Sequence, residues 1–188
     1  MVRLDALTQN DLPLIVEWRK ANPEGARTPT LITIEQERRW FDSLQEGGCP
    51  HRYWAVQSDC GDLQPECSCW HIVGLVGLTY IDPDNRRAEV AILINPARRG
   101  QGLGKQALML VLAKGFDDMD LEQIYGEVYH CNPYVDWWGA RMREWEWYHV
   151  LLPQVKRWGG RRWDATWFLI TAPIWERMRG QRVGDEVP

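Results

Sequence analysis

The sequence predicts an α/β domain of the α+β type, in which a mixed central sheet of about seven strands is flanked by about four helices. Three observations support this prediction. Residues 90–94 are all apolar, which is typical of a central strand covered on both faces. Residues 103–115 repeat apolar side chains at helical spacing, and a loop with Gly100, Gly102 and Gly104 joins the two segments. The rest of the chain is expected to pack around this unit.

The elements before this unit follow from local start signals. Residues 2–7 predict a first strand, and Thr8 and Thr33 each open a capping box that predicts the beginning of a helix. Residues 53–57 and 72–80 predict two further strands, joined by a long loop. The N-terminal half is therefore expected to hold three strands and two helices before the central unit.

The elements after the central unit complete the sheet. Residues 123–129 predict a strand, and Asn132 with Pro133 is typical of the N-cap and first turn of a fourth helix. Residues 147–152 and 163–171 predict the two strands of a closing hairpin. A mixed sheet with a terminal hairpin is the expected result.

Length and composition limit the domain organisation and the class of protein. The 188 residues suffice for one domain with a real core, so we expect residues 1–175 to form it and 176–188 to be a C-terminal tail. The 22 basic and 26 acidic side chains give a net charge of −4. This charge argues against a general nucleic-acid binder while leaving room for a local basic patch.

The expected compartment is the cytoplasm. No apolar run approaches the length of a membrane span, so no membrane partner is expected. Arg3 and Asp5 interrupt the first residues, so no signal-peptide core is expected either. Five cysteines, an odd number, favour reduced thiols over a disulfide framework.

The glycine loop predicts an anion site, because its backbone amides lie at the start of a helix. Its Gly-x-Gly-x-Gly spacing differs from the dinucleotide fingerprint. A phosphate loop of the Walker type is excluded, because Arg99 and Gln106 stand where that motif needs Gly and Ser or Thr. The remaining pattern, Arg99-x-x-Gly102-x-Gly104, resembles the pyrophosphate-binding loop of the GNAT superfamily of acyl-CoA-dependent N-acetyltransferases.

The resemblance to the GNAT superfamily extends from residue 1 to about residue 175. Segments that look like its RimJ/RimL-like branch are residues 2–4, 11–19, 73–78, 82–89 and 160–164. Members of that branch acetylate ribosomal-protein N-termini, polyamines or amino-sugars. The resemblance implies the GNAT fold, acetyl-CoA or another acyl-CoA as co-substrate without a required metal, and direct transfer to a primary amine of a small molecule or peptide. It also allows a homodimer.

Two alternatives to this activity stay open. One is a catalytically degenerate GNAT fold that serves as a binding or interaction module. The other is modification of an amine on a nucleic acid, which only the basic and aromatic residues of the closing hairpin favour. In both alternatives the fold would be the same, so the site residues must decide between them.

The resemblance also implies a set of cofactor-binding residues. The backbone of the strand end would bind the pantetheine arm, and the loop would bind the pyrophosphate through charge-assisted hydrogen bonds. The residues so implied are Leu93, Ile94 and Asn95 at the strand end and Arg99, Gly100, Gln101, Gly102, Leu103, Gly104 and Lys105 in the loop. Asn132 matches an asparagine that meets the CoA arm in the family, although it is an equally natural helix N-cap.

Glu89 is the candidate general base. It stands at the head of an apolar strand, where a carboxylate is costly to desolvate and takes up a proton more readily. It also matches the position at which several GNAT enzymes place their general base. The alternative is a strand-end glutamate that pairs with Arg86 or Arg87.

The candidate general acid is a tyrosine that must come from an unusual place. The family usually has a tyrosine about seven residues after the asparagine to protonate the departing sulfur, but this chain has Gly139 there. Tyr134 or Tyr148 would have to substitute for it, or the thiolate would leave unassisted.

Tryptophans and one arginine are the candidate acceptor-binding residues. We expect Trp18, Trp137 and Trp138 to wall the acceptor cleft, with Trp158 and Arg161 at the hairpin tip gripping the acceptor. The alternative is a solvated turn whose tryptophans pack against the core.

A cysteine and histidine cluster precedes the central strand. Cys60, Cys67, Cys69 and His71 could supply four soft ligands to zinc. Their spacing matches no standard zinc knuckle, so we interpret them as reduced thiols of a surface loop and expect no metal site.

Overall fold

A seven-stranded mixed sheet forms the centre of the computed structural model, which describes residues 1–27, 32–59 and 69–185, without the side chains of 181–185. The strands are β1 (Val2–Ala6), β2 (Arg52–Asp59), β3 (Trp70–Asp82), β4 (Arg87–Ile94), β5 (Gln123–Tyr129), β6 (Tyr148–Trp158) and β7 (Arg161–Thr171). Their order in the sheet is β1-β2-β3-β4-β5-β7-β6, and only β4 and β5 pair in parallel. The predicted fold class is confirmed.

Five α-helices accompany the sheet in the described part of the chain. They are α1 (Leu12–Lys20), α2 (Ile34–Ser43), α3 (Leu103–Ala113), α4 (Val135–Glu144) and α5 (Ala172–Asp185). Shorter helical turns lie at Gln9–Asp11, Pro23–Gly25, Pro96–Arg98 and Lys114–Asp118. None of the helices in the described part of the chain is long and apolar enough to cross a membrane.

The predicted capping boxes form as expected, but one of them starts a different element. Thr33 Oγ1 accepts a hydrogen bond from the Gln36 amide at 3.2 Å, and the Gln36 side chain accepts one from the Thr33 amide at 2.9 Å, so α2 begins there. Asp11 likewise accepts a hydrogen bond from the Thr8 amide at 2.8 Å. The capping box at Thr8 therefore opens the short turn Gln9–Asp11, and α1 begins only after this turn.

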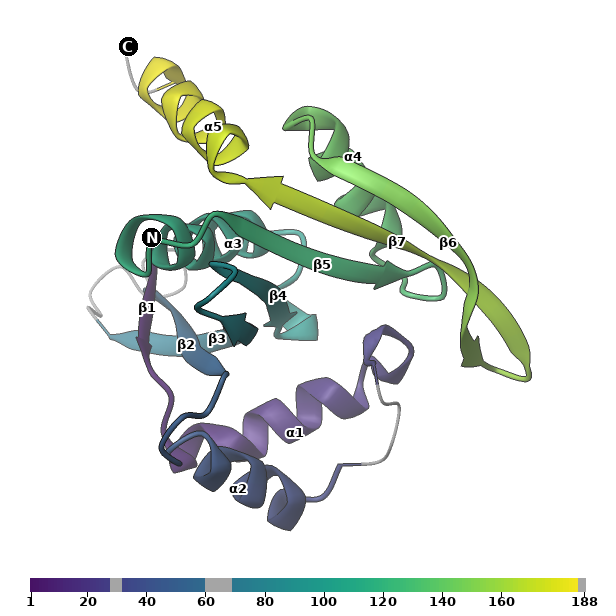
Figure 1. Cartoon of the computed structure of the whole chain (residues 1–188). Helices are drawn as coiled ribbons and strands as arrows, with labels where there is room; N and C mark the ends of the chain where they lie inside the picture. Colours follow the sequence, from purple (N-terminus) through teal and green to yellow (C-terminus); the bar gives the residue numbers. More distant parts are fainter. Residues whose placement is uncertain (28–31, 60–68, 186–188) are drawn as a thin grey trace.

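Two hydrophobic cores lie on the two faces of the sheet. In Figure 1, α3 covers one face of the N-terminal strands, and α1 and α2 cover the other. Alternate side chains of β3 serve the two cores, because Leu75 packs with α1 whereas Val76 packs with α3. Trp18 was expected to bind the acceptor, but it belongs to the core under α1 and is 5% exposed. It lies about one helical turn after Ile15, which belongs to the same core.

The C-terminal segment corrects a second expectation. Residues 176–185, expected as a tail, continue α5, and Trp175 and Met178 are buried in the larger core. Trp175 stacks on Phe116 with ring centroids 5.8 Å apart, and its Nε1 donates a hydrogen bond to Asp117 at 2.8 Å. The apolar stripe of α5 is too short to give a clear helical period in the sequence, which explains the wrong prediction.

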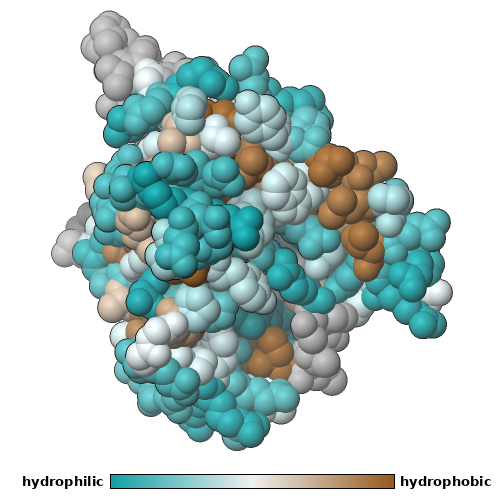
Figure 2. Space-filling model, in the orientation of Figure 1, coloured by the Kyte–Doolittle hydropathy of each residue, from teal (hydrophilic) through white to brown (hydrophobic). Residues whose placement is uncertain are grey.

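The far edge of the sheet is an exposed apolar strand. β6 is the last strand in the sheet order, and Val150, Leu151 and Val155 on it are about half exposed. Figure 2 shows apolar side chains gathered on the side of the molecule where Figure 1 places β6. An uncovered apolar edge strand favours association with another chain.

The feature that positions the site is the divergence of β4 from β5. The two strands pair only at Arg87 with Gln123, Ala88 with Ile124 and Glu89 with Tyr125. Beyond these pairs, β4 continues alongside β3 and β5 continues alongside β7. Figure 1 shows the two strands separating. The sheet therefore opens directly after Glu89.

We expect Trp175→Ala to lower the free energy of unfolding by about 3 kcal/mol, because it leaves a core cavity and removes the hydrogen bond to Asp117. Urea denaturation measures this change. Arg177→Ala, on the exposed side of the same helix, should change it by less than about 0.5 kcal/mol. Equal effects of the two substitutions would mean that α5 is not part of the cooperative domain.

Candidate functional site

A cavity of about 370 Å³ lies between the end of β4, the glycine loop and α4, and we call it the glycine-loop cavity. Its lining residues are Asn22, Ile92, Leu93, Ile94, Arg98, Arg99, Gly100, Gly102, Leu103, Gly104, Lys105, Tyr134, Trp137, Trp138 and Arg141. Eight of the residues that were predicted to bind a cofactor are among them. They come from the strand end and the loop, as the sequence predicted.

Three predicted cofactor residues shape this cavity from outside its lining. The Asn95 side chain accepts a hydrogen bond from the Ala97 amide at 2.9 Å, which fixes the turn before the loop. Gln101 accepts one from Arg98 Nε at 2.8 Å. Asn132 Oδ1 accepts one from the Tyr134 amide at 3.0 Å. Their side-chain oxygens are thus used within the protein, and their contact with a cofactor stays a prediction.

The loop needs glycine for its conformation. Gly100 has φ 79° and Gly102 has φ 74°, both in the left-handed region that other residues rarely adopt. Gly102 is the N-cap of α3, so the first amides of that helix lie beside the cavity. Helix amides without partners carry partial positive charge and bind anions. The anion site predicted from the loop therefore has the required local geometry.

The cavity carries an excess of positive charge. Arg98, Arg99, Lys105 and Arg141 line it. Lys105 pairs with Glu144 at 2.8 Å and Arg141 pairs with the same carboxylate at 2.7 Å. Among the described residues, Arg98 and Arg99 have no carboxylate partner. The four cations are balanced by one carboxylate, and the remaining positive charge suits a ligand with several phosphate oxygens.

Sequence reasoning missed Arg98, Arg141 and Asn22 in this cavity. Arg98 could have been found from its place next to Arg99, and Arg141 from its place one helical turn after Trp137. Asn22 lies far away in the sequence, at the end of α1, and no local signal marks it. Within the part of the chain that the structure describes, its buried Oδ1 has no hydrogen-bond partner, so it is available to a ligand's N–H group.

Tyr134 and the neighbouring tryptophans form the α4 side of the cavity. Tyr134 is the N-cap of α4, and its hydroxyl accepts a hydrogen bond from Arg99 Nη1. The guanidinium also lies 4.2 Å from the Tyr134 ring centre. Trp137 and Trp138 were expected to wall an acceptor cleft, but both line the glycine-loop cavity. Trp138 is 8% exposed and stacks on Phe168 at 5.3 Å, which fixes it there.

A second cavity, of about 320 Å³, lies where β4 and β5 separate, and we call it the acidic cavity. Its lining residues are Arg27, Tyr80, Glu89, Tyr125, Glu127 and Trp167. Glu89 and Tyr125 are the last pair of the parallel ladder, so this cavity begins at the point of divergence. Two carboxylates and three aromatic rings around one arginine suit a cationic ligand.

Glu89 is paired with a cation that the sequence did not point to. Its side chain is 13% exposed and accepts a hydrogen bond from Arg27 Nη2. The expected partners pair elsewhere, because Arg86 contacts Asp120 and Glu122, and Arg87 contacts Asp82. Arg27 is 62 residues away from Glu89 in the sequence, which is why periodicity could not reveal the pair.

Burial and charge shift the pKa of several groups around Arg27. Desolvation alone would lower the pKa of Arg27, but attraction to and hydrogen bonding with Glu89, and contacts with Tyr129, raise it above its ordinary value. Desolvation, followed by repulsion from Glu89, raises the pKa of the Tyr125 phenol. Both shifts keep Arg27 charged and Tyr125 neutral at physiological pH.

A third cavity, of about 240 Å³, lies along β4 and has lining residues in common with each of the other two. It shares Arg27 with the acidic cavity, and it shares Asn22, Ile92 and Leu93 with the glycine-loop cavity. Ala91 and Tyr53 also line it. The three cavities thus follow one another along β4, from the glycine loop to the cavity that Glu89 lines.

Three further predicted residues lie away from these cavities. Tyr148 is 63% exposed on the edge strand β6, so it is wrongly placed for a general acid. Trp158 and Arg161 pair across the hairpin end, where Arg161 lies 3.4 Å from the Trp163 ring centre and Trp163 Nε1 donates to the Trp158 carbonyl at 3.1 Å. The tip residues contact one another and line none of the three cavities, contrary to the expectation of acceptor contact.

Half of the predicted cysteine and histidine cluster lies outside the described residues, namely Cys60 and Cys67. Of the other two, Cys69 Sγ lies 3.1 Å from His71 Nε2. Cys69 is disulfide-bonded, which contradicts the expectation that all five cysteines are reduced thiols. Cys49 and Cys131 are free thiols.

Comparison with known proteins identifies a family for this arrangement. A family model described as an acetyltransferase (GNAT) domain matches residues 2–135. An N-acetyltransferase 9-like protein from Nematostella vectensis is 35% identical over 63 residues, which is 32% of this chain and 32% of that protein. The chain thus matches about a third of the length of this relative.

Solved structures of a bacterial enzyme share the fold. A mutant form of the spermidine/spermine N-acetyltransferase SpeG from Vibrio cholerae matches with a TM-score of 0.76 and 21% identity, covering 95% of this chain and 98% of that chain. The Vibrio cholerae enzyme in complex with CoA and spermine matches with a TM-score of 0.73 and 20% identity, covering 93% and 98%. Identity at this level establishes the likeness of fold.

Proposed function

The chain belongs to the GNAT acetyltransferase family, and on that premise we propose that it transfers an acyl group, acetyl first of all, from acyl-CoA to a primary amine. The observation that carries the proposal is the placement of two cavities of opposite charge along β4, with a third cavity that shares lining residues with each of them. One suits a phosphorylated donor and the other a cationic acceptor. The RimJ/RimL-like branch is part of the proposal, on the sequence segments that resemble it.

Each chemical group of the proposed donor, acyl-CoA, would have its own binding residues in the glycine-loop cavity. The pyrophosphate would lie against the amides at the start of α3, with Arg98 and Arg99 as counter-charges. The pantetheine arm would follow β4 past Leu93, where the strand has no β5 partner. The unpartnered Oδ1 of Asn22 would accept a hydrogen bond from an amide N–H of that arm.

The proposed reaction follows from groups that line the acidic and glycine-loop cavities. A neutral acceptor amine attacks the thioester carbonyl carbon, so a C–N bond forms while Glu89 takes the extra proton from nitrogen. The C–S bond then breaks, and the CoA thiolate takes the proton of the Tyr134 hydroxyl. Transfer of the proton from Glu89 through solvent restores Tyr134. The products are the N-acyl amine and CoA.

Tyr134 takes the role of the absent family tyrosine in this proposal. It lines the donor cavity, whereas Gly139 does not. Its oxygen accepts a hydrogen bond from Arg99, so its own O–H group is free to donate to a ligand atom. A guanidinium beside the phenol also stabilises the negative charge that remains after proton transfer.

The acceptor is proposed to be a small-molecule or peptide amine. The acidic cavity has one excess negative charge, because Arg27 balances the charge of only one of the two carboxylates, Glu89 and Glu127. An acceptor bound to a nucleic acid would bring phosphates to this cavity, so the charge counts against that alternative. A homodimer remains an expectation, supported by the exposed apolar edge at β6.

Acetyl-CoA at about 100 times its Kd should raise Tm by roughly 5–10 °C, because binding to the folded state stabilises it by about 2.7 kcal/mol. Gly102→Glu should abolish this shift by placing a negative charge at the pyrophosphate site. Gly102→Ala has the same backbone strain without the charge, so it should retain part of the shift. Thermal melts with millimolar acetyl-CoA measure both, and an unchanged wild-type melt would reject the donor.

Glu89→Gln should lower kcat by roughly 10²- to 10⁴-fold, because it removes the proton acceptor while keeping the shape of the side chain. The affinity for acetyl-CoA, measured by calorimetry, should stay nearly unchanged. Glu17→Gln, an exposed change on α1, is the control and should leave kcat unaltered. Full activity of the Glu89→Gln variant would return Glu89 to a structural role.

Tyr134→Phe should lower kcat by roughly 3- to 30-fold, less than a typical general acid contributes, because a CoA thiolate is already a tolerable leaving group. Tyr148→Phe should leave kcat unchanged, since Tyr148 lies outside the cavities. Single-turnover kinetics at saturating amine measure both. The account of the acid fails if Tyr148→Phe is the more damaging change.

A further inference from the structure

Among the described residues, Arg27 is the one cation that lines the acidic cavity, and it lies where a substrate cation would bind. We propose that Arg27 is a specificity-determining residue: its guanidinium holds the place of the acceptor's charged group between Glu89 and Glu127. An acceptor with a second positive charge displaces it and thereby frees Glu89 to act as the base. This inference rests on the proposed N-acyltransferase function and names its acceptor class, a diamine or a longer polycation.

The contacts of Arg27 are those that proteins use to bind ammonium groups. Its Nη2 donates to Glu89 and lies 3.9 Å from a carboxylate oxygen of Glu127. Its guanidinium carbon lies 5.6 Å from the ring centre of Tyr80. Two carboxylates and an aromatic face form a cation site, and the protein fills this site with a side chain of its own.

The ion pair keeps Glu89 from acting as a base. A carboxylate oxygen that accepts a hydrogen bond from a guanidinium has its charge and a lone pair committed to that contact. Arg27 is the partner that can leave, because its side chain is 48% exposed whereas that of Glu89 is 13% exposed. Rotation of the Arg27 side chain towards solvent would uncover Glu89 without moving β4.

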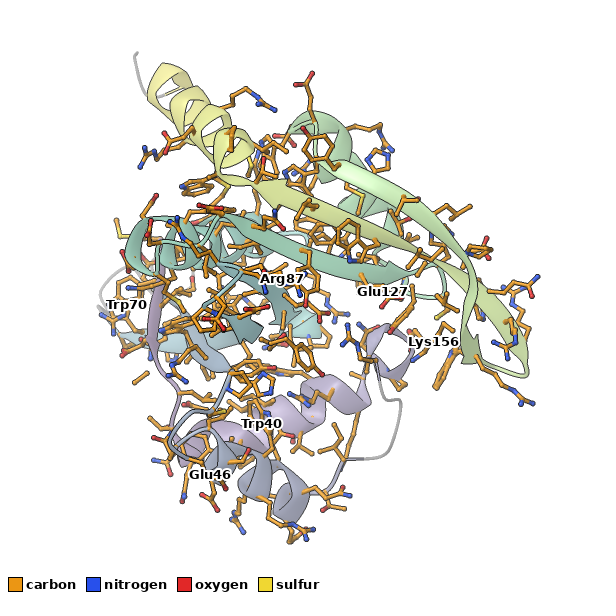
Figure 3. The ribbon with its side chains drawn as sticks, in the orientation of Figure 1. Trp40, Glu46, Trp70, Arg87, Glu127 and Lys156 are labelled. Carbon is orange, nitrogen blue, oxygen red and sulfur yellow. The ribbon has the colours of Figure 1, made fainter. Side chains whose placement is uncertain are left out.

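The backbone of Arg27 is held by hydrogen bonds, whereas its side chain is about half exposed. Lys156, 5% exposed on β6, donates hydrogen bonds from Nζ to the Ala26 carbonyl at 2.6 Å and the Arg27 carbonyl at 2.9 Å. The same ammonium lies 4.6 Å from the ring centre of Tyr129. Figure 3 shows Glu127 and Lys156 both directed towards this turn after α1. A displaced guanidinium would therefore stay close and return after product release.

The charge count explains why a second positive charge is needed. When Arg27 leaves, Glu89 and Glu127 both lose their counter-charge. The reacting amine must become neutral, so a monoamine leaves Glu127, 20% exposed, without a partner. A diamine presents a neutral nitrogen to the thioester and an ammonium to Glu127 at the same time. The cavity therefore favours acceptors with two amines.

Calorimetry on the purified full-length chain without acyl-CoA tests the proposal with cadaverine as the diamine and pentylamine as the monoamine. Arg27→Gln should bind cadaverine roughly tenfold more tightly than wild type, because the competing internal cation is gone. Arg38→Gln, an exposed change on α2, should bind it as wild type does. Unchanged or weaker cadaverine binding by a folded Arg27→Gln variant would overturn the proposal.

A second pair of variants keeps the test decisive if Arg27→Gln does not fold. Arg27→Lys keeps the positive charge but loses the planar guanidinium group. Its affinity for cadaverine should therefore lie between those of wild type and Arg27→Gln. Glu127→Gln should abolish the preference for cadaverine over pentylamine. If Glu127→Gln retained that preference, the proposal would be overturned. It would also be overturned if an acidic peptide, such as Asp-Glu-Asp, bound to wild type but not to Arg27→Gln.

The failure of this inference differs from the failure of the proposed function. Acetyl-CoA binding, read from the Tm of wild type and Arg27→Gln, tests the donor cavity alone and should be equal in both. If neither protein binds acetyl-CoA, the proposed function fails, while the cadaverine affinities still decide the role of Arg27. If both bind acetyl-CoA and cadaverine affinity does not rise, the role of Arg27 fails alone.

Discussion

The structure depends on one constraint, the early end of the parallel pairing between β4 and β5. Three residue pairs hold the two strands together, and both strands then continue with other partners. A strand that loses its neighbour exposes backbone groups that need hydrogen bonds from elsewhere. Here the freed edge of β4 lies in the glycine-loop cavity, where a bound chain can supply those bonds. The break in the sheet is thus also the position of the candidate site.

Opposite charges are arranged on the two sides of this break. The glycine-loop cavity collects four cations and the start of α3, whereas the acidic cavity collects two carboxylates and one arginine. An anionic donor and a cationic acceptor would each be drawn to its own side and meet along β4. In the proposed reaction, this separation would keep the acceptor away from the phosphates of the donor. Charge placement therefore supports a ternary complex more directly than any single residue does.

The parts of this site that the sequence could predict are those determined by neighbours in the chain. The glycine loop, its helix and the capping box at Thr33 depend on local backbone conformation, so the residues at these positions predict them. Arg27 and Asn22 reach the site from the end of α1, and only the folded sheet brings them to β4. Trp18 shows the opposite limit, because an aromatic side chain at helical spacing looks the same whether it faces a core or a ligand.

The α4 helix shows why a missing motif residue need not mean a missing function. Gly139 lies five positions after Tyr134, which places the two on different faces of a helix with 3.6 residues per turn. A hydroxyl at the helix start lies next to the glycine loop, as the contact between Tyr134 and Arg99 demonstrates. The room around Gly139 is instead occupied by the Arg143 side chain, 3.3 Å from the place a Cβ would take. A phenol at position 139 would need that arginine to move, whereas a phenol at position 134 is already held by a loop cation. For the proposed mechanism, the position of the proton donor is therefore better judged from its contact with the glycine-loop cavity than from its spacing along the sequence.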